Sequence, residues 1–285
     1  NVAKNFTNTF YGMMALYVSG QKISVIFQEP RISDNFVPWL TRTRGGRRAL
    51  ALLQIGDWIR ASRELRYLYE QASTMQKKDM MMFAVTHNMP GLAFRLADLY
   101  LKSTGEAFNT ALYPQPKTNI NFDIDPAIIY GIIRKESSFY PLARSRARAS
   151  GLMQIMPATA AFISNDRRFR NKNRHLLNNP DINLKLGQDY IIHLLETPVV
   201  SQHLFKLLAA YNAGPGNLNK WIKKIDYRGD SFLFLESIPS RETRVYVKSV
   251  AVNIWMYRLK EDRDTSDLRT LVAGKAGDAG IAFLK

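Results

Sequence analysis

A single glutamate, Glu136, stands on the apolar face of a short stretch with helical spacing. Ile129, Ile132 and Ile133 precede it at the intervals that place side chains on one face of a helix. An ionised carboxylate pays heavily for losing water on such a face, so the pattern favours the protonated acid. A glutamic acid that stays protonated near neutral pH can donate a proton as a general acid.

The helix that carries Glu136 is expected to end at or near this residue. The partial negative charge at a helix C-terminus then disfavours the anion further. A second interpretation stays open, in which Glu136 lies at the helix rim and pairs with Arg144, Arg146 or Arg148. These three arginines are better suited to a solvated or substrate-facing strip than to a tight ion pair.

Three further motifs could contribute polar groups to the same site. They are Gly151-Leu152-Met153-Gln154, Ala210-Tyr211-Asn212-Ala213-Gly214 and Glu242-Thr243-Arg244-Val245-Tyr246. Each also has a plain structural interpretation when it is taken alone. The first reads as a loop with a packed methionine, the second as an asparagine that caps a helix end, and the third as a core tyrosine.

The elements that must position these motifs are predicted to be helices. Asp125 is a suitable N-cap and Pro126 suits the first helical position of a helix that runs to Glu136. A later helix is expected from about 200 to 213, where a Gly-Pro pair follows. The last long helix is expected from Ser240 to about 259. Convincing alternating strands are scarce, so the sequence predicts a mainly α fold.

The first half of the chain reads as amphipathic helix pairs. Apolar residues recur at helical spacing from 47 to 101, with breaks at Gly56 and at Asn88-Met89-Pro90-Gly91. This pattern predicts a superhelical array of helix-turn-helix repeats, with a plain helical bundle as the alternative. Two prolines between 113 and 119 mark a boundary. The expected domains are therefore 1–117 (superhelical region), 118–262 (catalytic domain) and 263–285 (weakly ordered tail).

The net charge of +16 over 285 residues indicates a polyanionic partner. Residues 1–121 carry 15 basic and 8 acidic side chains, and residues 122–262 carry 21 and 13, so the excess divides evenly between the halves. Charge alone does not separate nucleic acid, anionic lipid and carboxylate-rich cell wall. No recognition helix, zinc-finger spacing or aromatic RNA-binding stretch is present, so nucleic acid is not expected as a partner.

The remaining composition argues against several kinds of chemistry. The chain has no cysteine, and its four histidines show no metal-ligand spacing, so neither a metal nor a cofactor is expected. No apolar run reaches the length of a membrane span. The sequence begins at Asn1 without the features of a signal peptide, which does not argue for the cytoplasm.

Together, in this order and spacing, the motifs resemble the catalytic domain of the soluble lytic murein transglycosylases, which has a goose-type lysozyme-like fold. The resemblance extends from about Phe122 to Leu259. It rests on Glu136-Ser137, Ala149-Ser150-Gly151-Leu152-Met153-Gln154-Ile155-Met156-Pro157, Ala210-Tyr211-Asn212-Ala213-Gly214-Pro215-Gly216 and the motifs between Glu236 and Lys248. The helical segment before it is similar to the end of the superhelical region of these enzymes, although it is shorter.

The resemblance implies cleavage of the β-1,4 bond between N-acetylmuramic acid and N-acetylglucosamine in peptidoglycan. Glu136 would protonate the glycosidic oxygen as general acid. It would then act as base on the muramyl C6 hydroxyl, which closes a 1,6-anhydro ring. This intramolecular attack needs no second carboxylate, unlike ordinary glycoside hydrolysis. Asp166, Asp181 and Asp189 lie outside the motifs and are expected to face solvent.

The resemblance also assigns roles to seven substrate-binding residues: Ser145, Met153, Gln154, Tyr211, Asn212, Tyr246 and Glu242. Gln154 and Met153 would line the groove, and Tyr211 and Asn212 would position an N-acetyl group. Ser145 would lie near the sugar hydroxyls, while Tyr246 would hydrogen-bond Glu136. Glycan strands and their stem peptides are the implied partner. Because the enzyme must be where its substrate is, the implied location is the periplasm.

Two other functions remain open at this stage. A hydrolysing muramidase would use the same glutamate with water as the nucleophile. A non-catalytic peptidoglycan-binding scaffold would use the helical array to recruit partners, but an intact Glu136 with all four motifs argues against it.

Overall fold

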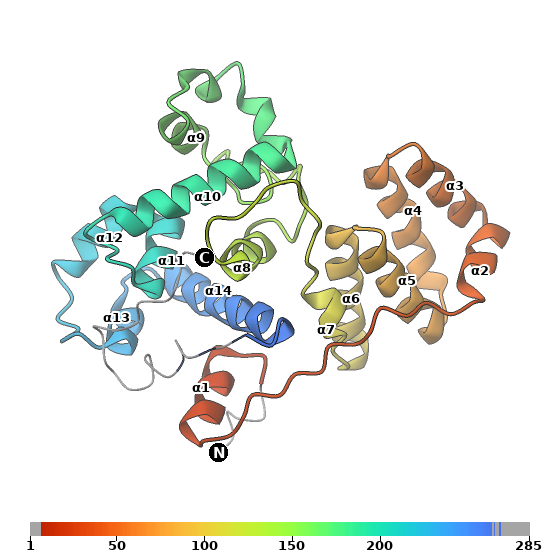
Figure 1. Ribbon diagram of the computed structural model, residues 1–285, viewed down its shortest axis with the longest axis horizontal. Helices are drawn as coiled ribbons and strands as arrows, with labels where there is room; N and C mark the ends of the chain where they lie inside the picture. The colour runs from red at the N-terminus through yellow and green to blue at the C-terminus, as the bar shows by residue number, and fades with distance from the viewer. Residues whose placement is uncertain (1–6, 264, 266–267, 269–285) are drawn as a thin grey trace. The chain divides into compact units, whose positions relative to one another are not determined.

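Two compact units divide the chain. The computed structural model describes residues 7–263, 265 and 268. Val25–Thr118 forms one unit, called the inserted unit here, and Asn1–Ser24 together with Asn119–Lys285 forms the other, called the discontinuous unit. Helices dominate both units (Figure 1), and the described residues form only isolated β-bridges and no named strand. The prediction of a mainly α fold is confirmed.

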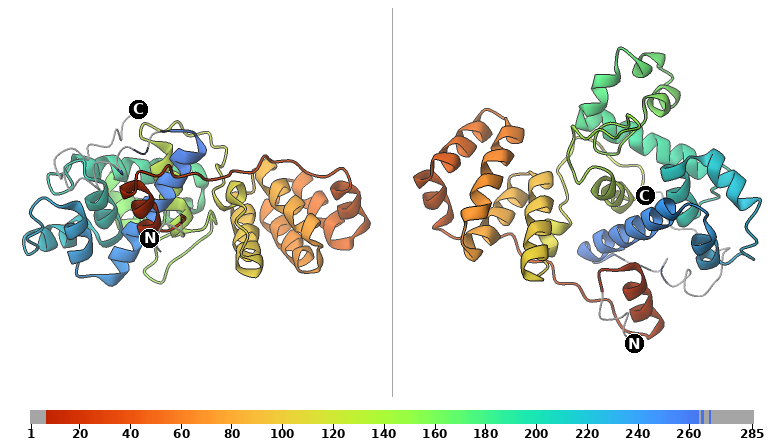
Figure 2. Two further views of the ribbon diagram at one scale, coloured as in Figure 1. Left: turned by 90° about the horizontal axis from the view of Figure 1, so that it is seen from below. Right: turned by 180° about the vertical axis from the view of Figure 1, so that it is seen from behind.

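The inserted unit consists of consecutive helices that lie side by side (Figure 2). The elements are α2 (Phe36–Arg42), α3 (Arg44–Gln54), α4 (Trp58–Gln71), α5 (Thr74–Thr86), α6 (Pro90–Thr104) and α7 (Asn109–Leu112). Helix α3 packs on α4, and α5 packs on α6. Gly56 supplies the left-handed residue between α3 and α4, with φ of 74°. Pro90 begins α6, so both breaks predicted from the sequence are present.

The discontinuous unit is assembled around helix α14 (Arg241–Lys260), which packs against α8 (Pro126–Glu136) and α11 (Leu204–Ala213). Its other elements are α9 (Pro157–Ile163), the 3-10 helices η2 (Arg167–Arg170) and η3 (Arg174–Asn178), α10 (Pro180–Glu196), α12 (Pro215–Ile222) and α13 (Ser231–Ser237). In Figure 1, α14 (blue) lies beside α8. The apolar residues of α8 between Ala127 and Ile133 are buried, which explains its amphipathic spacing.

The helix that carries Glu136 is held at its start by an ion-paired N-cap. The Asp125 carboxylate accepts a hydrogen bond from the Ala127 N–H, as the sequence predicted. Its two oxygens also accept from Arg258 Nε and from an Arg263 guanidinium nitrogen, each at 2.7 Å. Burial by itself would raise the pKa of Asp125, but these bonds hold it below its usual value. The ion pair between Asp125 and Arg258 therefore connects the start of α8 to the end of α14.

Helix α11 begins later than the sequence predicted. We expected a helix from about 200, whereas α11 starts at Leu204 with His203 as its N-cap. Ser201 and Gln202 adopt φ angles of 48° and 57°, a left-handed conformation that interrupts a right-handed helix. The C-terminal end agrees with the prediction, because Gly214 follows Ala213 and Pro215 begins α12.

Helix α1 (Phe10–Val18) belongs to the discontinuous unit, although its sequence precedes the inserted unit. Phe10 is buried and stacks on Trp255 of α14 with ring centroids 5.7 Å apart. On the surface, the Tyr11 hydroxyl donates to Glu236, and Lys248 bridges both side chains. The expected superhelical region of 1–117 therefore starts too early, because Phe10 is buried against Trp255 of the discontinuous unit.

Two predictions remain, one about the C-terminal tail and one about membrane-spanning helices. Most of the tail predicted for 263–285 lies outside the described residues. Within the described ranges, no helix combines the length and apolarity that crossing a membrane would require.

Candidate active site

Glu136 is the last residue of α8, and its carboxylate is mostly shielded from water. Tyr246 of α14 donates a hydrogen bond to Glu136 Oε1 at 2.7 Å. Burial raises the pKa of Glu136 to about 7, against the opposing effects of the Tyr246 hydrogen bond and the Lys135 charge. The site therefore contains a carboxyl group that is close to half protonated at neutral pH. No described arginine forms an ion pair with Glu136. The interpretation in which Glu136 pairs with Arg144, Arg146 or Arg148 at the helix rim therefore does not hold.

The backbone turns sharply directly after Glu136. Ser138 and Phe139 have φ angles of 51° and 63°, which cost of order 1 kcal/mol each for residues other than glycine. Arg148 and Gln154 have positive φ as well, so four of the ten described non-glycine residues with positive φ lie between Glu136 and Gln154. Strained backbone persists only where the surrounding structure holds it, and here the buried ring of Phe139 anchors the turn.

The glycine turn at 151–154 is fixed from α10 by one buried side chain, Asn183. Its Oδ1 accepts from the Met153 N–H at 2.8 Å, while its Nδ2 donates to the carbonyl oxygens of Ser150 and Leu177, each at 2.9 Å. Gly151 has φ of 83°, and a Cβ there would lie 2.2 Å from Asn183 Nδ2. Only glycine fits, because both the conformation and the close approach exclude a side chain.

Two tyrosines line the inside of the site. The Tyr211 hydroxyl donates to the Met153 carbonyl oxygen at 2.8 Å, which joins α11 to the glycine turn. Burial raises the pKa of both Tyr211 and Tyr246 well above the usual value, with the Glu136 charge as the next cause. Both hydroxyls therefore remain protonated donors across the physiological range. Tyr190 of α10 lies next to Tyr211, with ring centroids 5.5 Å apart.

Asn212 and Gln154 each use part of their amide inside the protein. Asn212 Oδ1 accepts from the Thr243 hydroxyl at 2.8 Å. Gln154 Nε2 donates to the carbonyl oxygens of Ala143 and Gly151 at 3.0 and 2.9 Å. Among the described residues, the Asn212 amide nitrogen and the Gln154 amide oxygen have no hydrogen-bond partner, so these two atoms are available to bind a ligand.

Two predicted substrate contacts look different in the structure. The Met153 side chain is fully buried against Gly187, so it does not line an open groove. The sequence predicts that Met153 lines the groove, because it does not reveal that α10 packs against this side chain. Ser145 Oγ accepts from the Ala149 N–H at 3.0 Å and so braces its own loop, although its hydroxyl proton stays available for another acceptor.

A second carboxylate lies close enough to affect Glu136. Glu242, in the first turn of α14, is exposed, and its charge raises the pKa of Glu136. The three aspartates expected to face solvent engage in local contacts instead of the site. Asp166 pairs with Arg168, Asp189 pairs with Lys185, and Asp181 accepts from Asn119.

Sequence reasoning missed Asn183 and Thr243, which act on the site through other residues. Asn183 had a signal of the same kind as Glu136, since Leu186, Gly187 and Tyr190 follow it at the spacings that share one helix face. Thr243 had none, because a threonine in the first turn of a helix is ordinary.

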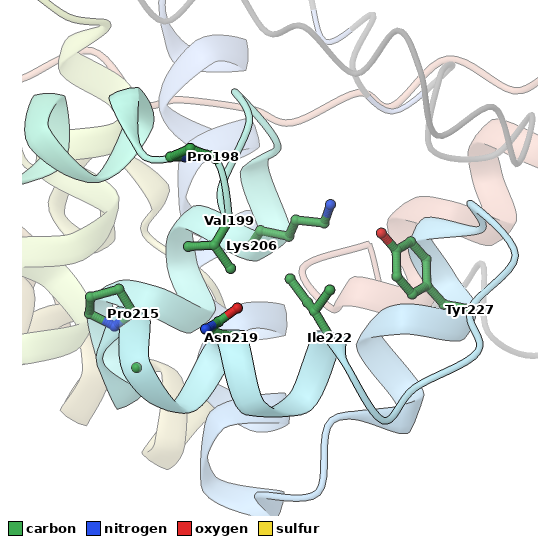
Figure 3. Close-up of a pocket in the computed structure, with 8 residues that line it drawn as sticks. Pro198, Val199, Lys206, Pro215, Asn219, Ile222 and Tyr227 are labelled. Carbon is green, nitrogen blue, oxygen red and sulfur yellow. The ribbon is translucent and has the colours of Figure 1, made fainter.

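An open hollow of about 590 Å³ lies elsewhere in the same unit, over α11 and α12 (Figure 3). Its lining residues are Pro198, Val199, Lys206, Pro215, Gly216, Asn219, Ile222 and Tyr227. The Lys206 ammonium is 5.3 Å from the centre of the Tyr227 ring. None of the candidate site residues lines this hollow, so it is distinct from the site at Glu136.

Fold and site together define a helical, lysozyme-like domain built around one carboxylic acid at a helix end. Residues 116–232 match the family described as the transglycosylase SLT domain. This part of the chain is therefore similar to the catalytic domain of the Slt-type lytic transglycosylases.

Several named proteins are similar to part of this chain. The soluble lytic murein transglycosylase of Salmonella typhimurium is 37% identical over 141 residues, which cover 48% of this chain and 21% of that protein. A putative soluble lytic murein transglycosylase of Haemophilus influenzae is 29% identical over 177 residues, or 62% of this chain and 28% of that one. The chain thus spans less than a third of these relatives.

Solved structures extend the likeness of the fold to both units. The 70 kDa soluble lytic transglycosylase of Escherichia coli matches with a TM-score of 0.77 at 22% identity, over 100% of this chain and 45% of that chain. The lytic transglycosylase Slt of Pseudomonas aeruginosa, solved as an inactive glutamate-to-glutamine mutant, matches with a TM-score of 0.68 at 26% identity. That match covers 90% of this chain and 42% of the other.

Proposed function

We propose that this chain is a lytic transglycosylase that cleaves the β-1,4 bond between N-acetylmuramic acid and N-acetylglucosamine in peptidoglycan. One observation carries the proposal: the Glu136 carboxyl, with its pKa raised to about 7, is oriented by the Tyr246 hydroxyl at 2.7 Å. A group with this pKa can both give and take a proton at neutral pH.

The proposed reaction uses Glu136 twice. Its acid form protonates the glycosidic oxygen as the bond to C1 breaks. The resulting carboxylate then removes the proton of the muramyl C6 hydroxyl, and that oxygen attacks C1 to close the 1,6-anhydro ring. Burial favours the neutral acid at the start of the cycle, and the Tyr246 hydrogen bond stabilises the carboxylate in the second half. The tethered nucleophile has a high effective concentration, so no water has to be positioned.

The remaining polar groups support binding of the sugar. We assign the Gln154 amide oxygen and the Asn212 amide nitrogen to hydrogen bonds with the saccharide, including its N-acetyl group. Ser145 and Glu242 lie on the loop and the helix that flank these atoms. The catalytic part would be the discontinuous unit, and Val25–Thr118 would be a superhelical linker segment. The enzyme would act in the periplasm, where peptidoglycan is found.

Digestion of purified peptidoglycan, followed by mass analysis of the products, tests this proposal. Wild-type protein should release 1,6-anhydromuramyl products, and Glu136→Gln should release at least about 100-fold less, as for removal of a general acid–base group. Products one water heavier would indicate the hydrolysing muramidase instead. Undiminished cleavage by Glu136→Gln would overturn the assignment of the acid. The inactive glutamate-to-glutamine variant of the Pseudomonas protein is a substitution of the same kind.

A further inference from the structure

Helices α8 and α14 approach each other closely at Gly131, in the middle of α8. A Cβ atom at this position would lie 2.9 Å from the Ile254 side chain and 3.4 Å from the Cβ of Asn253. Glycine inside a helix costs about 1 kcal/mol relative to alanine. Its presence in α8 is therefore explained by the close approach of the two helices.

Asn253 of α14 uses both ends of its amide to bind α8. The residue is only 3% exposed. Its Nδ2 donates to the Gly131 carbonyl oxygen at 3.0 Å, and its Oδ1 accepts from an Arg134 guanidinium nitrogen at 2.7 Å. The second hydrogen bond has an ionised donor, and such bonds are stronger than neutral ones. Because Gly131 and Arg134 are about one turn apart, the two bonds fix both the rotation of α8 and its position along α14.

The contact at Asn253 lies between two other polar contacts of the same antiparallel helix pair. From one end of the pair to the other, the contacts are Asp125 with Arg258, Gly131 with Asn253, and Glu136 with Tyr246. Asn253 follows Tyr246 by seven residues, which is two helical turns or about 10.5 Å along α14. A slide or rotation of α8 at Asn253 would therefore change the distance between Glu136 and Tyr246.

Asn253 is a polar residue in a run of α14 that is buried from Val250 to Arg258. An apolar side chain could be buried there without loss of hydrogen bonds to water. In coiled coils, a buried asparagine fixes the register of the helices at a cost in stability. The asparagine in α14 is explained in the same way, by the one arrangement of α8 that satisfies its amide.

We propose that Asn253 is a positioning residue for the reaction of Glu136. By binding Gly131 and Arg134, it fixes the position of α8 on α14. The Glu136 carboxyl is thereby held at the Tyr246 hydroxyl, 2.7 Å away. The inference rests on the proposed function and adds to it a residue that touches no substrate.

Two variants loosen the contact between the helices in different ways. Asn253→Ala removes both hydrogen bonds. Gly131→Ala keeps the asparagine but inserts a Cβ between the helices, although alanine raises the intrinsic helix propensity of α8. The matched control is Gln188→Ala on α10. It also removes a fully buried amide with two hydrogen bonds, both of which go to Asp123.

The pKa of Glu136 and the rate of peptidoglycan cleavage are measured in each variant. Carbon NMR of the Glu136 carboxyl, identified by the loss of its signal in Glu136→Gln, gives the pKa independently of activity. The Tyr246 hydrogen bond lowers this pKa, so a loosened contact should raise it above its value of about 7. The basic limb of the kcat/KM profile should move to higher pH accordingly.

The two kinetic constants should respond differently. In Asn253→Ala and Gly131→Ala, kcat should fall by up to about tenfold, which is the loss expected for the Tyr246 hydrogen bond itself. KM should stay within about twofold of wild type, because the proposed sugar-binding groups of Gln154 and Asn212 lie on other elements.

Combination with Tyr246→Phe separates positioning from a general loss of stability. Without the Tyr246 hydroxyl, Asn253→Ala should change neither the pKa of Glu136 nor kcat any further, although the free energy of unfolding should still fall. Gln188→Ala should lower stability but leave the pKa of Glu136 unchanged in both backgrounds. The other groups that act on Glu136 or feel its charge are Tyr211, Lys135 and Glu242, and all three are present in every variant.

Several results would overturn the inference. An unchanged pKa of Glu136 in both Asn253→Ala and Gly131→Ala would remove Asn253 from the site. Additive losses of kcat in combination with Tyr246→Phe would show that Asn253 acts on folding in general. The same pKa shift in Gln188→Ala would assign the effect to any loosened core. If the wild-type protein releases no anhydromuramyl products but the pKa shifts as expected, the proposed function fails and the positioning of Glu136 by Asn253 stands.

Discussion

At the scale of single residues, the molecule depends on one carboxyl group in an environment that opposes its charge. Two neighbours act on Glu136 in opposite directions. The Tyr246 hydroxyl stabilises the carboxylate, and the Glu242 charge destabilises it, while burial sets the overall rise of its pKa to about 7. This balance leads to two predictions about pH.

The first prediction concerns stability. The pKa of Glu136 is about 7 in the folded protein and 4.5 in the unfolded chain. Above pH 4.5 the unfolded chain therefore loses the Glu136 proton first, and the free energy of unfolding falls until the pH reaches about 7. Glu136→Gln mimics the neutral acid, so it should match wild type below pH 4.5 and gain stability as the pH rises to about 7. The advantage should then level off at about 3 kcal/mol. Denaturant unfolding at pH 4, 6 and 8 measures it, and a constant difference across that range would contradict the assigned pKa.

The second prediction concerns activity and uses two substitutions with opposite signs. Tyr246→Phe removes the bond that lowers the pKa of Glu136, so the basic limb of the kcat/KM profile should move to higher pH. Its maximal rate should fall roughly tenfold, because an oriented hydrogen bond is lost. Glu242→Gln removes a negative charge and should move the same limb to lower pH. The exposed Val245, exchanged for alanine, serves as the control and should leave the profile in place.

At the scale of elements, three helices and one turn bring the site together. Helix α8 supplies Glu136, α14 supplies Tyr246 and Thr243, and α11 supplies Tyr211 and Asn212. The glycine turn lies against α10, where Gly187 leaves room for Met153, since a Cβ at 187 would lie 2.1 Å from the Met153 sulfur. The geometry of the turn is therefore set by α10, an element that carries none of the predicted site residues.

The third prediction tests this dependence on α10. Asn183→Ala leaves the Met153 N–H and two carbonyl oxygens without their partner in a buried place, which should cost about 3 kcal/mol of unfolding free energy. Activity should fall along with the ordering of the turn, even though Asn183 touches no substrate. Asn178→Ala, on an exposed asparagine of the neighbouring η3, should change stability by less than about 0.5 kcal/mol. Similar effects of both substitutions would show that the turn does not depend on Asn183.

At the scale of the whole molecule, two separate segments of the chain form the discontinuous unit. Helix α1 returns Phe10 to the core formed by Trp255, Phe205 and Phe232, across 94 intervening residues of the inserted unit. Helix α1 is therefore part of the core of the discontinuous unit and not of the inserted unit.

The fourth prediction follows from that contribution. Phe10→Ala should lower the stability of the discontinuous unit by about 3 kcal/mol, the usual loss for a buried phenylalanine, and should reduce peptidoglycan cleavage on heating. Tyr67→Ala removes an aromatic ring that is 74% exposed in the inserted unit and should have little effect. Thermal unfolding of both variants in the full chain measures the difference. An unchanged midpoint for Phe10→Ala would place α1 outside the cooperative core.

The sequence by itself determined the local features of this protein. The extent of α8 could be predicted from Asp125, Pro126 and the isoleucine spacing, because caps and amphipathic faces depend on residues within a few positions of one another. The exposed side of the site, including the basic loop at 144–148, was also visible in the sequence. The start of α11 was not, since the left-handed turn at Ser201 and Gln202 has no glycine to announce it.

Only the tertiary structure decided which residues meet. Tyr246 reaches Glu136 across 110 positions, and Tyr211 reaches Met153 across 58. Asn183 joins the turn from a helix that no motif marked, and Arg174 joins Arg144 and Arg148 from another segment. Such contacts depend on how helices pack, and packing is set by the fit of many side chains at once. For the same reason, the raised pKa of Glu136 belongs to the folded molecule, because its main cause is burial by distant parts of the chain.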